Sequence, residues 1–276
     1  MKRLRWLKRA GILFFLVPVL LVLVFPFAVM ISTSFKTLQE ANRIPPTFIP
    51  RDPTLQNYRE VWQIVPLGRH FANSLMLGAG EALLVLIVGI PAAYALCRYR
   101  FAGRRLYVGF LLFTQMFPPV VVILGLFRLV AAYGLVDNLL VVIAIATAFN
   151  LALCIWLLSG YFAAIPEEIE EASMIDGTSR GGALLRMTIP LSWPGLTAVA
   201  IFAFMDGWNE FLLSLTLLNS EESLPLTVGL FRFVGRYQIH WPHLMAGSFL
   251  ATLVAVALFM LVQKNLTRGL MGIAES

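Results

Sequence analysis

The chain has 276 residues, of which 59% are hydrophobic and only 13% are charged. Soluble domains have about 45–50% apolar and about 25% charged residues, so this composition and the mean hydropathy of +0.81 exclude an ordinary soluble protein. The net charge of +6 would suit a nucleic-acid-binding protein, but the basic residues flank apolar runs instead of forming one polar domain.

The first element is a basic segment, residues 1–9, followed by an apolar run over residues 10–31. This pattern predicts a transmembrane helix whose N-terminal end lies in the cytoplasm, because cytoplasmic flanks are enriched in Lys and Arg. The alternative is a cleaved signal peptide. Its apolar region would be shorter and would end at a small-residue cleavage site, which is not evident before Ser32.

Residues 32–69 are then predicted to be extracytoplasmic. Pro45, Pro46, Pro50 and Pro53 exclude regular helix there and favour a fixed extended loop, although an ordinary linker is the simpler interpretation. The second span, 70–96, returns to the cytoplasmic side, which is marked by Arg98, Arg100, Arg104 and Arg105.

The remaining apolar runs predict four more spans. They cover residues 110–130, where Pro118 and Pro119 break the helix, and residues 139–158, 193–218 and 243–262; residues 263–276 form a cytoplasmic tail. The prediction is an all-α membrane protein with six transmembrane helices, both termini in the cytoplasm and a core domain over about 70–265. Cys97 and Cys154 have no neighbours at zinc-ligand spacing, so no metal site is expected.

Residues 161–191 form a polar loop between two predicted spans. Pro166 suits a first helical position, and Asp176-Gly177 should end the first helix because glycine can adopt the left-handed conformation. Thr178 or Ser179 can cap a second helix that runs to about Met187. The residue before Pro190 is biased away from helix.

Helical spacing gives the first of these helices a narrow apolar strip, while acidic residues crowd the rest of its surface. The strip contains Ile169, Ala172 and Ser173, with Ile175 beside them; the acidic residues are Glu167, Glu168, Glu170, Glu171 and Asp176. An acidic helix would be repelled by an anionic lipid surface. We therefore expect the strip to insert into a groove on another protein. The alternative is a solvated helix that merely connects two spans.

This loop resembles the cytoplasmic signature of binding-protein-dependent ABC import permeases. The similar residues are Glu171-Ala172-Ser173, Asp176-Gly177 and Thr188-Ile189-Pro190-Leu191, with Ser173 in place of the usual second Ala and Pro190 one position early. Three further segments are similar to the carbohydrate-uptake branch of the family: the proline-rich external loop, Ala93–Arg104 and Gly207–Phe211.

The resemblance implies a type I importer-like fold with a cytoplasmic coupling helix, located in a bacterial-type inner membrane. It also implies that the loop residues Glu170, Glu171, Ala172, Ser173, Ile175, Asp176, Gly177 and Pro190 couple to an ATPase. The implied partners are a second permease chain, two ATP-binding subunits, an extracytoplasmic solute-binding protein and a carbohydrate. No cofactor would bind this chain, because ATP would be used by the partner subunit.

Several polar residues fall within predicted spans, where such residues usually face a bundle interior or an aqueous cavity. Candidates for a translocation path are Gln115, Asn150, Asp206, Trp208, Asn209 and Glu210. Asp206 and Glu210, four residues apart, are predicted to share one helix face, and Trp208 would offer an apolar face to a sugar ring. Alternatively, these groups hold helices together by hydrogen bonds. Glu81 has no assigned role.

The sequence contains no GxxxxGK[ST] phosphate loop, nucleophile elbow or HExxH motif. The chain is therefore expected to be a transport subunit and not an enzyme. Two hypotheses follow: a permease subunit of an ATP-driven importer of a carbohydrate, or a self-contained proton-coupled carrier that uses Glu81, Asp206 and Glu210. The second is disfavoured because such carriers usually contain inverted repeats, which this sequence lacks.

Overall fold

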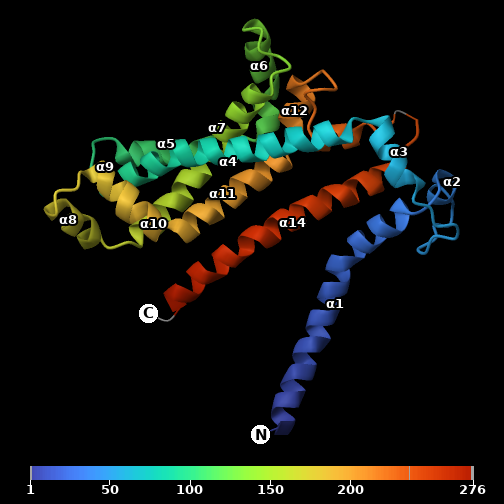
Figure 1. The fold of residues 1–276 in the computed structure, drawn as a ribbon, viewed down its shortest axis with the longest axis horizontal. Coiled ribbons are helices and arrows are strands. Elements are labelled where there is room, and N and C mark those ends of the chain that lie inside the picture. Colours follow the sequence, from blue (N-terminus) through green and yellow to red (C-terminus); the bar gives the residue numbers. More distant parts are fainter. Residues whose placement is uncertain (1, 236, 275–276) are drawn as a thin grey trace. The chain divides into compact units, whose positions relative to one another are not determined.

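The computed structural model describes residues 2–235 and 237–274, and the side chains of residues 14–235, 237–258 and 260 (Figure 1). The described part is helical, and its β pairing is limited to one isolated bridge between Val234 and Ile239. The predicted all-α class is therefore confirmed. The side chains of residues 2–9, whose basic residues were used to predict the topology, and those of the predicted cytoplasmic tail, residues 263–276, lie outside the described side chains.

The helices in chain order are α1 (Lys2–Ser34), α2 (Leu38–Ala41), α3 (Gln56–Ile64), α4 (Leu67–Arg98), α5 (Arg104–Thr114), α6 (Pro119–Ala132), α7 (Leu139–Ala163), α8 (Glu167–Ile175), α9 (Arg180–Ala183), a π-helical turn (Leu184–Thr188), α10 (Ile189–Leu191), α11 (Trp193–Trp208), α12 (Leu212–Leu217), α13 (Leu226–Phe231) and α14 (Trp241–Ala274). Four segments of the described residues are long and apolar enough to cross a membrane singly: Phe14–Ser34, Leu67–Arg98, Leu139–Ala163 and Trp241–Leu258. Two bent pairs raise the number to as many as six.

The chain divides into two compact units, Met1–Pro66 with Leu230–Val254, and Leu67–Gly229 with Ala255–Ser276. In the first unit, the proline-rich segment between α2 and α3 is held by side chains. The Glu40 carboxylate accepts hydrogen bonds from Thr47 Oγ1 and from the Arg51 N–H, both at 2.9 Å. The buried Asn57 amide donates to the carbonyl oxygens of Ser34 and Lys36 at 2.8 and 2.9 Å. These contacts fix an irregular backbone that the prolines keep out of a helix.

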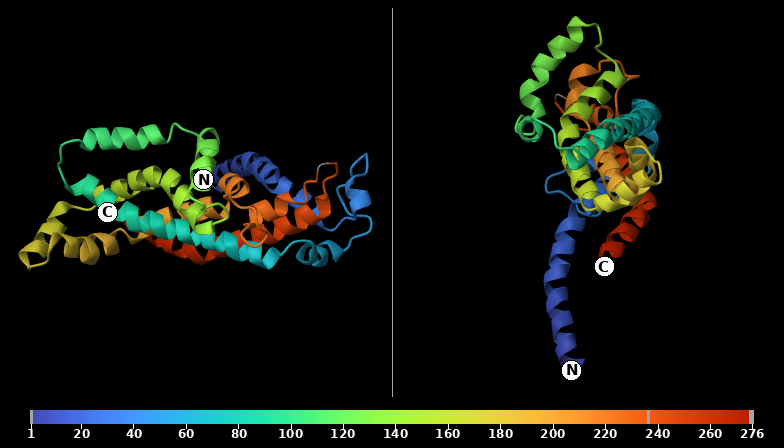
Figure 2. Two further views of the ribbon diagram at one scale, coloured as in Figure 1. Left: turned by 90° about the horizontal axis from the view of Figure 1, so that it is seen from above. Right: turned by 90° about the vertical axis from the view of Figure 1, so that its left-hand side faces the viewer.

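In the second unit, α4, α7 and α11 pack side by side and enclose two apolar clusters (Figure 1). One contains Leu77, Val142 and Leu213, and the other contains Val85, Ile155, Leu158 and Val199. Figures 1 and 2 show the α8–α10 segment at one end of this bundle. The bundle is therefore the scaffold that positions the polar loop.

Two glycines allow α4 and α11 to approach closely. A Cβ atom on Gly207 would lie 2.9 Å from the Gly78 Cα atom and 2.9 Å from the Leu77 carbonyl oxygen; a Cβ atom on Gly78 would lie 2.8 Å from the Phe204 carbonyl oxygen. Small residues commonly permit such backbone contact between membrane helices. Since backbone atoms cannot rotate away, this crossing tolerates no added methyl group.

Gly207→Ala is accordingly expected to destabilise the α4–α11 contact by about 1–3 kcal/mol, the usual cost of overpacking. Thermal unfolding in detergent measures this effect. Gly109→Ala is the matched control, because a Cβ atom there would meet nothing within 4 Å. Equal unfolding temperatures for the two variants would contradict the close approach.

The predicted spans 110–130 and 193–218 are not single straight helices. α5 and α6 are bent by 95° around residues 115–118, where Pro118 and Pro119 were expected to break the helix. The prediction of one continuous helix over 193–218 is wrong, because α11 ends at Trp208 and α12 begins at Leu212. Asn209 Nδ2 donates to the Met205 carbonyl oxygen at 2.7 Å, and Glu210 Oε1 accepts from the Leu213 N–H at 2.7 Å. These two polar side chains thus form hydrogen bonds with a backbone carbonyl group in the last turn of α11 and a backbone N–H group in the first turn of α12.

Candidate functional site

The polar loop begins with α8, whose ends follow from local chemistry. Glu167 and Glu168 lie in the first turn, where negative charge interacts favourably with the helix dipole. Pro166 is the residue preceding the helix, one position before its predicted place. Gly177 has φ = 87°, the left-handed conformation predicted for the residue that ends this helix. The chain can therefore reverse direction immediately after Asp176.

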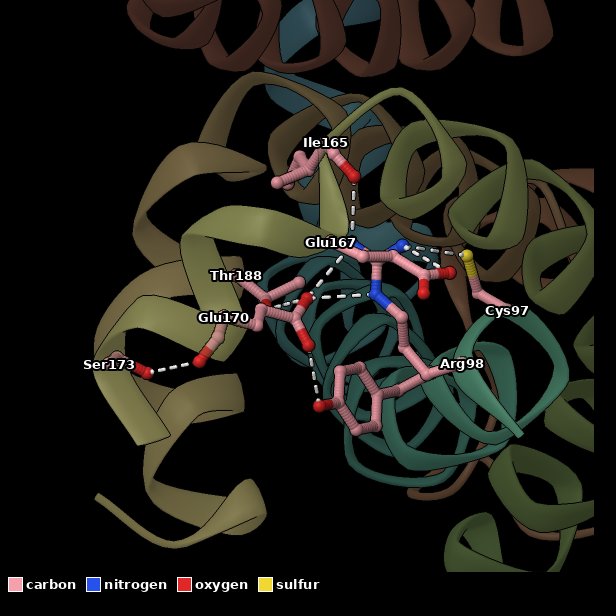
Figure 3. Close-up of polar contacts among 8 residues, drawn as sticks. Cys97, Arg98, Ile165, Glu167, Glu170, Ser173 and Thr188 are labelled. Atoms are coloured by element: carbon pink, nitrogen blue, oxygen red, sulfur yellow. Dashed lines mark hydrogen bonds and ion pairs between the residues drawn. The ribbon is translucent and has the colours of Figure 1, made fainter. Parts of the chain in front are cut away.

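One side of α8 is anchored to the end of α4 through Glu170 (Figure 3). Arg98 Nε and Nη2 each lie 2.9 Å from Glu170 Oε1, and Tyr94 Oη donates to Glu170 Oε2 at 2.8 Å. Thr188 Oγ1 donates to Oε1 at 2.8 Å, and Arg98 Nη2 donates to the Ile165 carbonyl oxygen at 2.9 Å. The side chains of Arg98 and Glu170 are both 6% exposed. A buried, fully hydrogen-bonded ion pair therefore joins α4, α8 and the turn before α10.

The Glu170 anchor has a defined pH dependence. Burial opposes ionisation of the carboxyl group, but hydrogen bonds from Arg98, Thr188 and Tyr94 outweigh it and lower the pKa of Glu170. A carboxylate whose folded-state pKa is lowered stabilises the fold above its unfolded pKa, about 4.3 for Glu. That stabilisation is lost as the pH falls through the lower folded-state pKa.

We therefore expect α8 to stay attached at pH 5 and to loosen only below about pH 4. A spin label at position 175, in a Cys97→Ser background, reports this as a gain in mobility. In Glu170→Gln the label should show no transition in that range. A mobility change between pH 5 and 7 in the parent chain would contradict the assignment.

The opposite side of α8 faces away from the bundle. Ile175 is 87% exposed, and Glu168, Glu171 and Ala172 are also exposed. Ile169 is partly exposed as well, at 39%. Ala172 and Ile175, three residues apart, lie on the same side of the helix, so exposed apolar and acidic side chains adjoin there. We call Glu168, Glu171, Ala172 and Ile175 the outer face of α8.

Two residues that were predicted to be exposed on the first helix of the loop, Glu170 and Ser173, lie on the side of α8 that faces the bundle. Ser173 was expected in the apolar docking strip and Glu170 on the acidic solvent-facing surface, and both expectations are wrong because both residues are buried. Ser173 Oγ donates to the Glu170 carbonyl oxygen at 2.8 Å. The reason is that Arg98 and Tyr94 provide a polar environment for the carboxylate beneath the helix.

The second half of the loop packs onto the bundle. Ser179 caps α9 by accepting a hydrogen bond from the Gly182 N–H at 3.2 Å, as predicted, and the Arg180 guanidinium lies 5.3 Å from the centre of the Tyr99 ring. The expected loss of helix before Pro190 does not occur. The Ile189 N–H bonds to the Leu184 carbonyl oxygen in a π-helical turn, and Pro190 then sits near the start of α10, where its missing N–H costs little.

Among the polar residues within the spans, Asn150 joins two helices. Its Nδ2 atom donates to Glu81 Oε1 at 2.9 Å, and Cys154 Sγ lies 3.8 Å from Asn150 Oδ1. Glu81 is fully buried. This arrangement supports the helix-packing interpretation for Asn150 and gives Glu81 the same role between α4 and α7.

The other candidates lie near the end of α11 and at the end of α5. Trp208 is only 4% exposed and stacks against Phe204, so the expectation that it offers an open ring face is wrong. Asp206 and Glu210 do not share a helix face either, because Glu210 follows the end of α11. Asp206, Asn209 and Gln115 remain exposed; Gln115 Nε2 donates to the Phe149 carbonyl oxygen at 2.9 Å.

Residues 85–271 match the model of a family described as "Binding-protein-dependent transport system inner membrane component". The chain is 34% identical to the inner membrane ABC transporter permease protein YcjP of Escherichia coli K12, over 96% of each chain. It is 31% identical to the trehalose/maltose transport system permease protein MalG of Thermococcus litoralis, over 96% of this chain and 95% of that one.

A solved structure has a similar fold. It is the crystal structure of a bacterial ABC transporter involved in the import of the acidic polysaccharide alginate, and the matched chain has a TM-score of 0.77 and 23% identity. The match covers 95% of this chain and 96% of that one.

Proposed function

Because the chain belongs to the family of binding-protein-dependent transport system inner membrane components, we propose that the outer face of α8 is where an ATPase subunit drives transport. The chain is the permease subunit, and ATP is hydrolysed by a separate subunit. The observation that supports this role is the division of α8 into two sides. Glu170 is fixed to the bundle, while Ile175 is 87% exposed.

The anchor explains how a push on α8 would reach the membrane helices. Glu170 is bonded to Arg98 and Tyr94 of α4 and to Thr188, which precedes α10 and α11. Displacement of α8 would therefore move α4 and α11 together, because breaking a buried ion pair is costly. Driving a population from 1:99 to 99:1 requires about 5.5 kcal/mol of differential binding. A docked helix with this attachment can transmit such an energy.

The proposed substrate is a carbohydrate, because the similar permease protein MalG of Thermococcus litoralis is named for trehalose and maltose transport. Asp206 and Asn209 are exposed polar residues proposed to contact hydroxyl groups along the path. Gln115 is not proposed for the path, because its amide donates to the Phe149 carbonyl oxygen and its side chain lines a separate groove between α5 and α7.

The complete assembly proposed is this chain with a second permease chain, two ATP-binding subunits and an extracytoplasmic binding protein. Both termini and the α8–α10 segment are proposed to face the cytoplasm, since basic residues cluster at those ends of the spans. No cofactor is proposed for this chain itself.

The energy source of uptake distinguishes this function from the alternative of a proton-coupled carrier. Membership of the family does not support that alternative. Uptake of radiolabelled oligosaccharides by cells that express the full transporter should continue when a protonophore collapses the proton gradient. It should stop when ATP is depleted at a maintained gradient. The opposite pattern would refute the proposal.

A further inference from the structure

A groove of about 810 Å³ runs between the ends of α4, α5 and α7 in the second unit. Its lining is mostly apolar and includes Leu112, Leu153 and Trp156, of which Leu112 and Trp156 are more than half exposed. At the end nearest α8 the lining changes to Arg98, Arg104 and Glu167. The groove is therefore apolar along its length and charged at one end.

The length of the groove matches the thickness of the hydrocarbon layer of one membrane leaflet. The groove-lining residues of α5 extend from Arg104 to Gln115, a distance of about 16 Å at 1.5 Å per residue. Half of a hydrocarbon core about 30 Å thick is about 15 Å. A single lipid could thus lie in the groove with its headgroup at the Arg104 end.

The charges at that end select the headgroup. Arg98 is already paired with Glu170 at 2.9 Å and lies 3.7 Å from Glu167, whose carboxylate is the one acidic group lining the groove. Arg104 is exposed and has no ion-pair partner among the described side chains. A phosphate group would supply the acceptor oxygens that a guanidinium matches in geometry. A transmembrane helix of another protein would instead bring apolar residues and leave Arg104 unpaired.

We propose that this groove binds an anionic phospholipid, with its phosphate at Arg104 and an acyl chain along Leu112, Leu153 and Trp156. The site is separate from the outer face of α8. It goes beyond the proposed function, because the lipid is neither the transported solute nor a subunit. Bound lipid would pack α5 against α7 beside the Arg98–Glu170 anchor.

The test uses the full transporter purified in mild detergent and reconstituted in nanodiscs that contain phosphatidylglycerol and phosphatidylethanolamine in equal amounts. Native mass spectrometry then counts the retained lipids by class. We expect selective retention of phosphatidylglycerol and an approximately fivefold loss in Arg104→Gln, as expected for removing one basic residue near an anionic lipid. Arg105→Gln removes the same charge from a residue outside the groove lining and should retain the lipid.

A second variant tests the groove without changing charge. Gly160 lines the groove, and a Cβ atom there would meet nothing within 4 Å, so Gly160→Leu should place an apolar side chain in the groove and displace the lipid. Gly109→Leu, on α5 but outside the lining, is the matched control. Equal retention of both lipid classes, or equal losses in Arg104→Gln and Arg105→Gln, would overturn the proposal. Cross-linking of Cys97, which lines the groove, to a second permease chain would also overturn it.

Discussion

Replacing Glu170 with alanine is expected to abolish uptake and to destabilise the end of the bundle by about 3–5 kcal/mol, the usual effect of removing one partner from a buried ion pair. Arg98 would be left 6% exposed and without the carboxylate that accepts its hydrogen bonds. The hydroxyl groups of Tyr94 and Thr188 would also lose their acceptor. Thermal unfolding in detergent and solute uptake in cells measure the two effects.

The matched control for this variant is Glu168→Ala, two residues earlier on the same helix. Glu168 is exposed, and the described residues include no hydrogen-bond or ion-pair partner for it. Its replacement removes only the interaction with the helix dipole, about 0.3–1 kcal/mol, and should lower the unfolding temperature much less than Glu170→Ala. In the double variant Arg98→Leu/Glu170→Leu, stability should recover in part, because apolar residues of similar size can replace a buried pair, while the buried Tyr94 and Thr188 hydroxyls still lack their acceptor. If Glu170→Ala unfolds at the same temperature as Glu168→Ala, the anchor is not important for stability.

Replacing Ile175 with aspartate is expected to weaken ATPase binding without lowering the stability of the fold. The side chain is 87% exposed, so the fold should retain its stability, while docking of the ATPase should weaken by about 2 kcal/mol or more, as for an interface hot spot. Uptake should then fall by roughly 30-fold or more at limiting ATPase. Affinity of the purified ATPase subunit for the reconstituted permease gives the direct measurement.

Leu191→Asp is a useful comparison for Ile175→Asp, because Leu191 is also an exposed apolar residue of the loop but lies outside α8. Its replacement should affect ATPase affinity less. If Ile175→Asp binds the ATPase as tightly as the parent chain, the outer face of α8 is not the docking surface.

Local chemistry was sufficient to predict the turns of the polar loop. The αL conformation of Gly177 and the capping by Ser179 depend on residues within a few positions along the chain. The anchor could not be predicted in this way, because Tyr94 and Arg98 lie 76 and 72 residues from Glu170 in the sequence. The available signals were the spacing of Glu170 and Ser173, three apart on one helix face, and the basic residues at the end of the second predicted span.

The end of α11 shows a second limit. Asn209 and Glu210 interrupt the apolar run, yet no glycine or proline directly follows Trp208 to indicate a break. The break is stabilised by the hydrogen bonds of Asn209 to Met205 and of Glu210 to Leu213, which compete with continued helix. Hydropathy alone predicts a continuous span there, and it therefore placed Asp206 and Glu210 on one face incorrectly.

The most direct test of the central claim is affinity purification of this chain from mild-detergent membranes, with quantification of the proteins that accompany it. The parent chain and Leu191→Asp, whose substitution lies outside α8, should bring down an ATPase with a phosphate loop and a second multi-span chain. Ile175→Asp should retain the second multi-span chain and lose the ATPase. Recovery of the ATPase in undiminished amount with Ile175→Asp, or its absence from the parent chain, would contradict the assignment of α8 as the coupling element.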